Sequence, residues 1–203
     1  LKRFFEDEKK EMPKLPNKSI AFILSIIGGI ISTSSLSAKY AVFANGGVFG
    51  HTDPIFNVDI GYYMFSLPFI QGLLIFLMEV VVATIVYVGL YYVITLNNYF
   101  DGVDIETLKK NTFIKQETIF IIIFAILFCM YIFISSQNIL TGNMLTIEDE
   151  LGTKIIGAGK ADVTIKLWGY RILSLVVIAS VIGLLLNIKK QSFKNGIISI
   201  LMT

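Results

Sequence analysis

The chain has 203 residues and a formal net charge of +2, and only 16% of its residues are charged, whereas an ordinary soluble domain has about 25%. Its mean hydropathy is +0.74, and its apolar residues form runs of about 20, long enough to cross roughly 30 Å of hydrocarbon. These features exclude an ordinary soluble domain, and the weak, scattered positive charge argues against a nucleic-acid partner. We therefore expect an all-α, polytopic transmembrane helix bundle in a cell membrane, with the lipid bilayer as its first partner.

The apolar runs divide the chain into a short charged segment and a transmembrane domain. Residues 1–18 contain many charges and two prolines, so we expect a cytoplasmic or interfacial segment there, and residues 19–203 form the transmembrane domain. The chain begins with Leu1 and ends a few residues into a further apolar run, so we interpret it as an internal piece of a larger protein. The expected spans are about 19–38, 68–92, 118–136 and 170–188, followed by a truncated span from about 195.

The first expected span carries small residues at every fourth position. These are Ala21, Ser25, Gly29, Thr33 and Ser37, which share one helix face. Small residues at this spacing allow two helix backbones to approach closely in lipid. The stripe therefore predicts tight helix packing, and a flexible or pore-lining face is the alternative.

The second apolar region, about 62–96, is too long for one upright span at about 1.5 Å per residue. Pro68 offers a break, because proline is tolerated in a first helical turn and disrupts a helix interior. We therefore expect a short interfacial helix over about 60–67, before the span that starts at Pro68. Tyr62, Phe65 and Phe69 are three and four residues apart, so we expect them on one face as an aromatic collar at headgroup level.

Lysine and arginine are distributed unevenly between the two sides of the expected spans. Twelve lie in the segments before span one, after span two and after span four, and five lie on the other side. Because the richer side of a membrane protein is usually cytoplasmic, residues 1–18 and about 97–116 are expected there. Residues of about 39–67 and 137–168 are then extracytoplasmic.

The stretch "FGHTDPIFNVDIGYYMFSLPF", residues 49–69, holds His51, Asp53 and Asp59 within nine positions. Asp53-Pro54 favours a turn, and Asp59 is placed to cap a short helix, because its side chain can accept a free backbone N–H. A metal site is the sharper alternative, although the spacing matches no zinc or EF-hand pattern. His51 has no nucleophile motif near it that would make it a general base.

The same stretch resembles the signature of uncharacterised protein family 0182, which consists of large multi-pass membrane proteins of bacteria and some archaea. The matching residues are Phe49, Gly50, Asp53, Pro54, Phe56, Asp59, Ile60, Tyr63, Phe65, Leu67 and Pro68. A second block, "GAGKADVTIKLWGYRIL", resembles the segment before the family's next span, with Lys160 and Ala161 where Tyr-Thr is typical. The resemblance implies a bundle of about seven spans followed by a large extracytoplasmic domain. The helices and domain that this chain lacks would be its partners, and the family has no established activity.

Two charged residues near the expected spans are candidate functional residues, as are Asp53 and Asp59. Glu79 lies about eleven residues past Pro68, near the middle of the bilayer, where a charge costs a few kcal/mol. It either faces an ion or proton path, or it is a neutral acid hydrogen-bonded to a neighbouring helix, since burial raises a carboxyl pKa. Arg171 follows Trp168 and Tyr170, and it is either a snorkelling arginine in an aromatic belt or a contact to an anionic lipid or substrate.

Two classes of function remain open from the sequence. The first is a membrane platform that anchors an extracytoplasmic domain or an envelope complex, with other membrane proteins or further copies of the chain as partners. The second is a transporter or channel with Glu79 in its path. Having a single deep ionisable residue and no broken pair of helices favours the platform. The sequence contains no catalytic set that would indicate an intramembrane enzyme, and it predicts no cofactor or metal.

Overall fold

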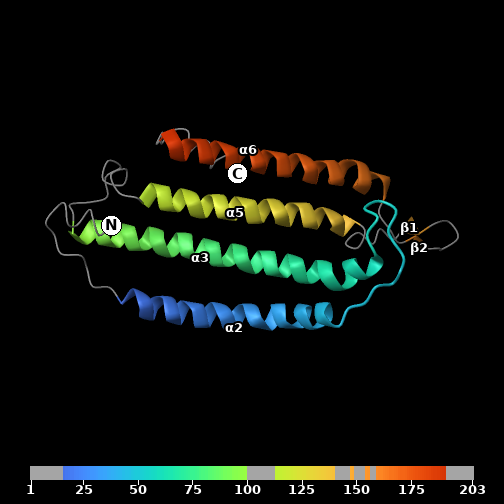
Figure 1. The fold of residues 1–203 in the computed structure, drawn as a ribbon, viewed down its shortest axis with the longest axis horizontal. Coiled ribbons are helices and arrows are strands. Elements are labelled where there is room, and N and C mark those ends of the chain that lie inside the picture. Colours follow the sequence, from blue (N-terminus) through green and yellow to red (C-terminus); the bar gives the residue numbers. More distant parts are fainter. Residues whose placement is uncertain (1–15, 100–112, 140–146, 149–153, 156–158, 191–203) are drawn as a thin grey trace.

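The computed structural model describes residues 16–99, 113–139, 147–148, 154–155 and 159–190. Four long helices lie side by side in one row, and each packs against the next helix along the chain (Figure 1). The long helices are α2 (Asn17–Ala44), α3 (Leu67–Tyr99), α5 (Phe113–Ser135) and α6 (Leu167–Lys190). The short elements are the π-helical segments η1 (Tyr62–Ser66) and η3 (Asp162–Lys166), the 3₁₀ turn η2 (Ser136–Ile139) and an antiparallel pair of two-residue strands, β1 (Ile147–Glu148) and β2 (Lys154–Ile155).

The described part of the chain is therefore almost entirely helical, as expected. Three helical stretches are long and apolar enough to cross a membrane: Tyr62–Thr95, Lys115–Asn138 and Asp162–Leu186. The expected first span lies in α2, which has 28 residues, and the described stretch Lys18–Ile30 of this helix is apolar. The expected fifth span and most of residues 1–18 lie outside the described residues.

The predicted break at Pro68 is wrong. The helix begins at Ile60 and continues without interruption through η1 into α3. In η1 the Leu67 N–H donates to the Tyr62 carbonyl, five residues back, so the turn before Pro68 is wider than an α-helical turn. A wider turn relieves the clash between a proline ring and the preceding carbonyls. The interfacial segment and the span are consequently one element.

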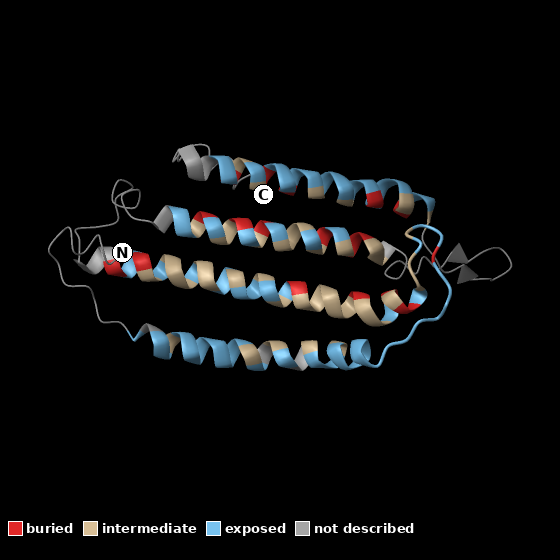
Figure 2. Cartoon of the chain, in the orientation of Figure 1, coloured by how far each residue is buried: buried red, intermediate tan, exposed pale blue. Residues whose placement is uncertain are grey.

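The best-buried packing lies between α5 and α6. Ala125, Ile132 and Val177 are almost fully buried and form a small apolar core between these two helices. Because the helices lie in a row, each is covered only along its edges, and most of the surface of α2 and α6 is exposed (Figure 2). These broad apolar faces are available to lipid or to further helices.

The small-residue stripe of α2 does not form the expected tight contact within the described residues. Gly28 and Gly29 have open space where a side chain would be, and Thr33 is exposed. Instead, α2 meets α3 nearer its C-terminal end, where a methyl group on Gly72 would lie 3.0–3.3 Å from side-chain atoms of Lys39 and Leu36. Larger residues of α2, not the small ones, therefore make the observed contact.

Candidate functional site

The candidate residues of the 49–69 stretch lie in a loop, residues 45–61, that connects α2 to η1 at one end of the row (Figure 1). The last turns of α5 and the segment η3 lie at the same end. We call this end of the bundle the loop end. It contains most of the charged and polar side chains that the sequence singled out.

The Asp53 carboxylate is the centre of the loop. Its Oδ1 accepts hydrogen bonds from the backbone N–H groups of Ile55 and Phe56, at 2.8 and 2.7 Å. Its Oδ2 accepts one from the Val58 N–H at 3.0 Å and one from the Tyr63 hydroxyl at 2.7 Å. Asp53 is 8% exposed, so its carboxylate is a buried acceptor for four donors and closes the turn that Asp53-Pro54 predicts.

The Asp59 carboxylate holds the two ends of the loop together. Its Oδ1 accepts hydrogen bonds from the N–H groups of Gly61, at 2.7 Å, and Phe49, at 3.1 Å. Its Oδ2 accepts one from the Gly50 N–H at 2.8 Å. The bond from Gly61 confirms the predicted helix cap, because that N–H belongs to the first turn of the helix that starts at Ile60. The other two bonds tie the start of the loop to its end.

These contacts keep both aspartates ionised. Burial acts to raise the pKa of Asp53, but the hydrogen bonds from Phe56, Tyr63, Val58 and Ile55 outweigh it and hold the pKa below its ordinary value of 3.8. The pKa of Asp59 is also lowered, chiefly by the Phe49 N–H. Neither carboxyl has the raised pKa that a general acid needs at neutral pH.

Close backbone packing fixes the position of the loop on η1. A Cβ atom on Gly61 would collide with the Gly47 carbonyl oxygen, and one on Gly46 would lie 2.6 Å from the Cβ of Phe65. Asn57 adopts a left-handed conformation, with φ of 55°, which asparagine tolerates better than most residues. The loop can therefore lie flat on the helix only because small residues stand at the contacts.

The expected aromatic collar is wrong in its arrangement. Phe65 stacks on Phe49 of the loop at 5.9 Å and Phe69 on Phe43 of α2 at 4.8 Å, whereas the Tyr62 hydroxyl donates to Gln137 Oε1 at the end of α5. The wide turn of η1 changes the angular spacing between successive residues, so Tyr62 contacts Gln137 while Phe65 and Phe69 contact α2 and the loop that follows it. The rings pack the loop, α2 and α5 onto the helix instead of lying together on a surface.

A third aspartate, Asp162, lies in the first turn of the helix that leads into α6. Asp162 Oδ2 accepts the N–H of Gly159, three residues back, and Asp162 Oδ1 forms an ion pair with Lys166 at 2.5 Å. The bond to Gly159 is the acidic half of a capping box. Asp162 is 3% exposed, so it has a structural role similar to that of Asp59.

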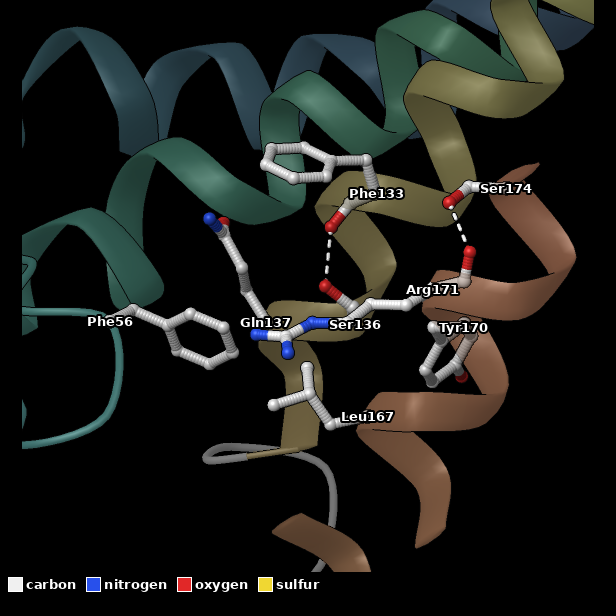
Figure 3. A pocket seen from close by; sticks show the side chains of 8 residues that line it. All are labelled: Phe56, Phe133, Ser136, Gln137, Leu167, Tyr170, Arg171 and Ser174. Atoms are coloured by element: carbon white, nitrogen blue, oxygen red, sulfur yellow. Dashed lines mark hydrogen bonds between the residues drawn. The ribbon is translucent and has the colours of Figure 1, made fainter. Parts of the chain in front are cut away.

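The other two candidate residues, Arg171 and Glu79, lie outside the loop that holds Asp53 and Asp59. The Arg171 guanidinium lies 5.4 Å from the centre of the Trp168 ring, and its side chain extends from α6 toward α5 (Figure 3). Glu79 is exposed and lies at the centre of the apolar stretch Tyr62–Thr95. The structure therefore brings Asp53 and Asp59 together in one loop and leaves Arg171 and Glu79 at separate places.

The described residues contain no group of three His, Cys, Asp or Glu side chains that could hold a metal ion. His51 is exposed, and its carbonyl accepts the Ile60 N–H, so its backbone is part of the loop. Since backbone donors already occupy the oxygens of both loop aspartates, the geometry is that of an internally bonded loop.

The sequence of the chain was compared with models of known protein families. The model of the uncharacterised protein family UPF0182 matches residues 3–203. The chain belongs to this family. Several of its loop-end residues, including Asp53, Asp59 and Pro68, are those on which the resemblance rested.

Curated UPF0182 proteins are similar over most of the chain. A UPF0182 protein of Clostridium tetani is 29% identical over 205 residues, which cover 95% of this chain and 22% of that protein. One of Salinispora arenicola is 28% identical over 80% of this chain and 16% of its own length. The chain thus spans about a fifth of the length of these relatives. No solved structure matches it.

Sequence reasoning missed three contacts of this UPF0182 chain, all at the loop end. They are the bond from the Tyr63 hydroxyl to Asp53, the bond from Tyr62 to Gln137, and the bond from the Gly159 N–H to Asp162. The Gly-x-x-Asp spacing from Gly159 to Asp162 is a visible helix-start signal. The bond from Tyr62 to Gln137 joins residues 75 positions apart, so no short sequence pattern predicts it.

Proposed function

We propose that this chain is part of a multi-pass platform in the cell membrane, with no enzymatic activity of its own. Its loop end faces the extracytoplasmic side and positions the remainder of the UPF0182 protein there. The observation that carries the proposal is the internal bonding of the loop end. Among the described residues, the donors to Asp53 and Asp59 belong to the loop and to the helix that follows it.

The strength of these hydrogen bonds favours a structural role for the two aspartates over direct chemistry on a ligand. Hydrogen bonds to a buried charged group such as Asp53 contribute about 1.5–3 kcal/mol each, so this part of the loop is held far more firmly than its lack of regular structure suggests. A carboxylate that acts on a ligand needs oxygens that a ligand can reach. A rigid loop that joins α2, η1 and α5 is instead a suitable base for a domain.

The lysine and arginine distribution supports the orientation. In the sequence, the segments on the loop-end side of the expected spans hold five lysines and arginines, including Lys39, Lys160 and Arg171, and the segments on the other side hold twelve. The broad exposed faces of the helix row also suit further helices of the same protein, other membrane proteins or a second copy of the chain.

Replacing the bundle tests the platform directly. In the full-length protein, the membrane bundle would be exchanged for an unrelated membrane anchor that displays the remaining part on the same side. If the bundle only anchors and positions, the exchanged protein restores a substantial part of the deletion phenotype. Failure to restore it, with normal surface display, would contradict the platform.

A transporter or channel is the second candidate, and the position of Glu79 favours it. Glu79 lies seven residues after Gly72, two turns further along α3, and therefore on the side that faces α2. There α2 presents Gly28 and Gly29 with open space around them. An acidic side chain and small residues facing a common space could line a path, and they could equally receive another helix.

A lipid-facing Glu79 is disfavoured in either case. A charged residue at the bilayer centre costs at least about 2.5 kcal/mol. We propose that a further helix of the full-length protein covers Glu79 and gives it a hydrogen-bond partner. Under the transporter alternative, water would reach it instead, and its proton would be exchanged during transport.

A further inference from the structure

A small cavity lies at the loop end between α5, α6 and the 45–61 loop (Figure 3). Its volume is about 200 Å³. Phe56 of the loop forms one wall, and the last turn of α5, the turn η2 and the first turns of α6 form the others. The lining residues are Phe56, Phe133, Ser136, Gln137, Leu167, Tyr170, Arg171 and Ser174.

Of the residues that the structure describes, Arg171 is the one charged residue that lines this cavity. Its side chain runs from α6 across the cavity toward α5 and Phe56 (Figure 3). Among the described residues it makes no ion pair, and its guanidinium lies over the Trp168 ring. The cavity thus combines mainly apolar walls with a cation that has no counter-charge in this part of the chain.

The polar groups around Arg171 do not neutralise it. The Ser136 hydroxyl donates to the Phe133 carbonyl at 2.6 Å, and the Ser174 hydroxyl donates to the Arg171 carbonyl at 2.8 Å. The Gln137 Oε1 accepts from Tyr62. A guanidinium presents several N–H groups in a planar fork that matches the oxygens of a phosphate. Arg171 is exposed, so an oxyanion that enters the cavity from outside can reach its guanidinium.

The size of the cavity limits the ligand. Pockets for drug-sized molecules usually measure about 300–1,000 Å³, so a cavity of about 200 Å³ is too small to enclose a nucleotide or an oligosaccharide. It has room for a phosphate group and a few attached carbon atoms. Apolar walls beside the cation suit a ligand that is charged at one end and apolar at the other.

We propose that this pocket binds the phosphate of an anionic phospholipid headgroup, with Arg171 as the anion-binding residue. Phe56 and Leu167 then contact the glycerol and the first methylenes of the lipid. The inference rests on the proposed membrane position of the loop end, where the exposed Trp168 lies three residues before Arg171 and its ring is 5.4 Å from the guanidinium. A bound lipid would join the loop to α5 and α6.

Native mass spectrometry of the full-length protein in detergent tests the proposal. The protein would be titrated with phosphatidylglycerol and, separately, with phosphatidylcholine and inorganic phosphate. We expect preferential retention of phosphatidylglycerol. Arg171→Gln should weaken its apparent affinity by about tenfold or more, the usual loss for a charge-assisted hydrogen bond. Arg171→Lys should give an intermediate loss, because lysine keeps the charge without the fork.

Two further variants separate the pocket from general surface charge. Lys160→Gln removes an exposed cation at the same end that does not line the cavity, and it should leave lipid affinity unchanged. Ser174→Phe keeps every charge but fills the cavity, so it should weaken binding. Ser174→Phe and Arg171→Lys decide the question if Arg171→Gln does not yield a monodisperse protein.

Several results would overturn the proposal. Equal losses in Lys160→Gln and Arg171→Gln would show that surface charge alone attracts the lipid. Equal binding of inorganic phosphate would identify a soluble anion as the ligand in place of a lipid. Unchanged affinity in both Arg171→Lys and Ser174→Phe would exclude the cavity. Because binding in detergent requires neither a platform role nor an orientation, a failure here leaves the proposed function standing.

Discussion

Removing the Asp53 carboxylate should detach the loop from the helix beneath it. Asp53→Ala deprives four donors of their acceptor. The bonds from the Ile55, Phe56 and Val58 N–H groups are part-buried, whereas the bond from the Tyr63 hydroxyl is buried. Leaving the Tyr63 hydroxyl without a partner costs about 1–3 kcal/mol, and the three part-buried N–H groups together lose a similar amount. We therefore expect a loss of about 2–6 kcal/mol in unfolding free energy.

Two variants show where this loss arises. Asp53→Asn keeps one acceptor oxygen, so it can serve the Ile55 and Phe56 pair or the Val58 and Tyr63 pair, but not both, and should cost about half as much. Tyr63→Phe removes one donor and leaves the carboxylate, with an expected loss of about 1 kcal/mol. In Tyr63→Phe/Asp53→Asn, the losses should be less than additive, because the two groups are bonded to each other.

Denaturant unfolding of the full-length protein in mixed micelles, with proteolysis of the loop as a second probe, measures these effects. Asp53→Ala should lower the unfolding midpoint and expose residues 45–61 to protease. A change below about 0.5 kcal/mol, the usual effect of a surface substitution, would refute the idea that this carboxylate organises the loop. So would full stability combined with a lost activity or a lost metal ion.

The other structural predictions concern packing, pH and orientation. Gly61→Ala should destabilise the loop end, because its Cβ would collide with the Gly47 carbonyl, whereas Gly47→Ala, with open space around it, should unfold like the parent protein. Because the folded pKa of Asp53 lies below 3.8, its contribution is complete above that pH and is lost as the pH falls through the folded value. Unfolding midpoints should thus be constant from neutral pH down to about pH 5 and fall below pH 4, less so in Asp53→Asn. In a cysteine-free background, Thr52→Cys should react with an impermeant thiol reagent on intact cells and Lys18→Cys should not; the reverse pattern would overturn the orientation.

The sequence predicted the positions of most helices but not the contacts between them. Apolar runs and the charges between them predicted the α3, α5 and α6 regions, because lipid-spanning helices must satisfy their backbone internally. The Asp59 cap was predictable because the donors nearest to it in sequence belong to the helix start. The continuous helix at Pro68 was not predicted, since nothing in the local pattern distinguishes a wide turn from a break.

The long-range contacts of the loop end could not be predicted from spacing. The Tyr62 to Gln137 bond depends on how α3 and α5 align, and that alignment follows from packing along their whole length. The small-residue stripe of α2 failed for a related reason. It predicts a close helix neighbour, but the described neighbour, α3, meets α2 through Leu36 and Lys39 instead.

Glu79 provides the most direct test of the platform against the transporter. In the full-length protein, Glu79→Gln keeps the shape and polarity of the side chain but cannot release a proton, and Glu79→Leu keeps neither. Complementation of a deletion strain, with membrane abundance measured in parallel, compares the two variants with the parent protein. If the bundle is a platform, Gln functions like Glu, and Leu lowers abundance by weakening a helix contact that contributes about 1 kcal/mol. A Glu79→Gln protein that is present at normal abundance and is inactive would contradict the platform and favour transport.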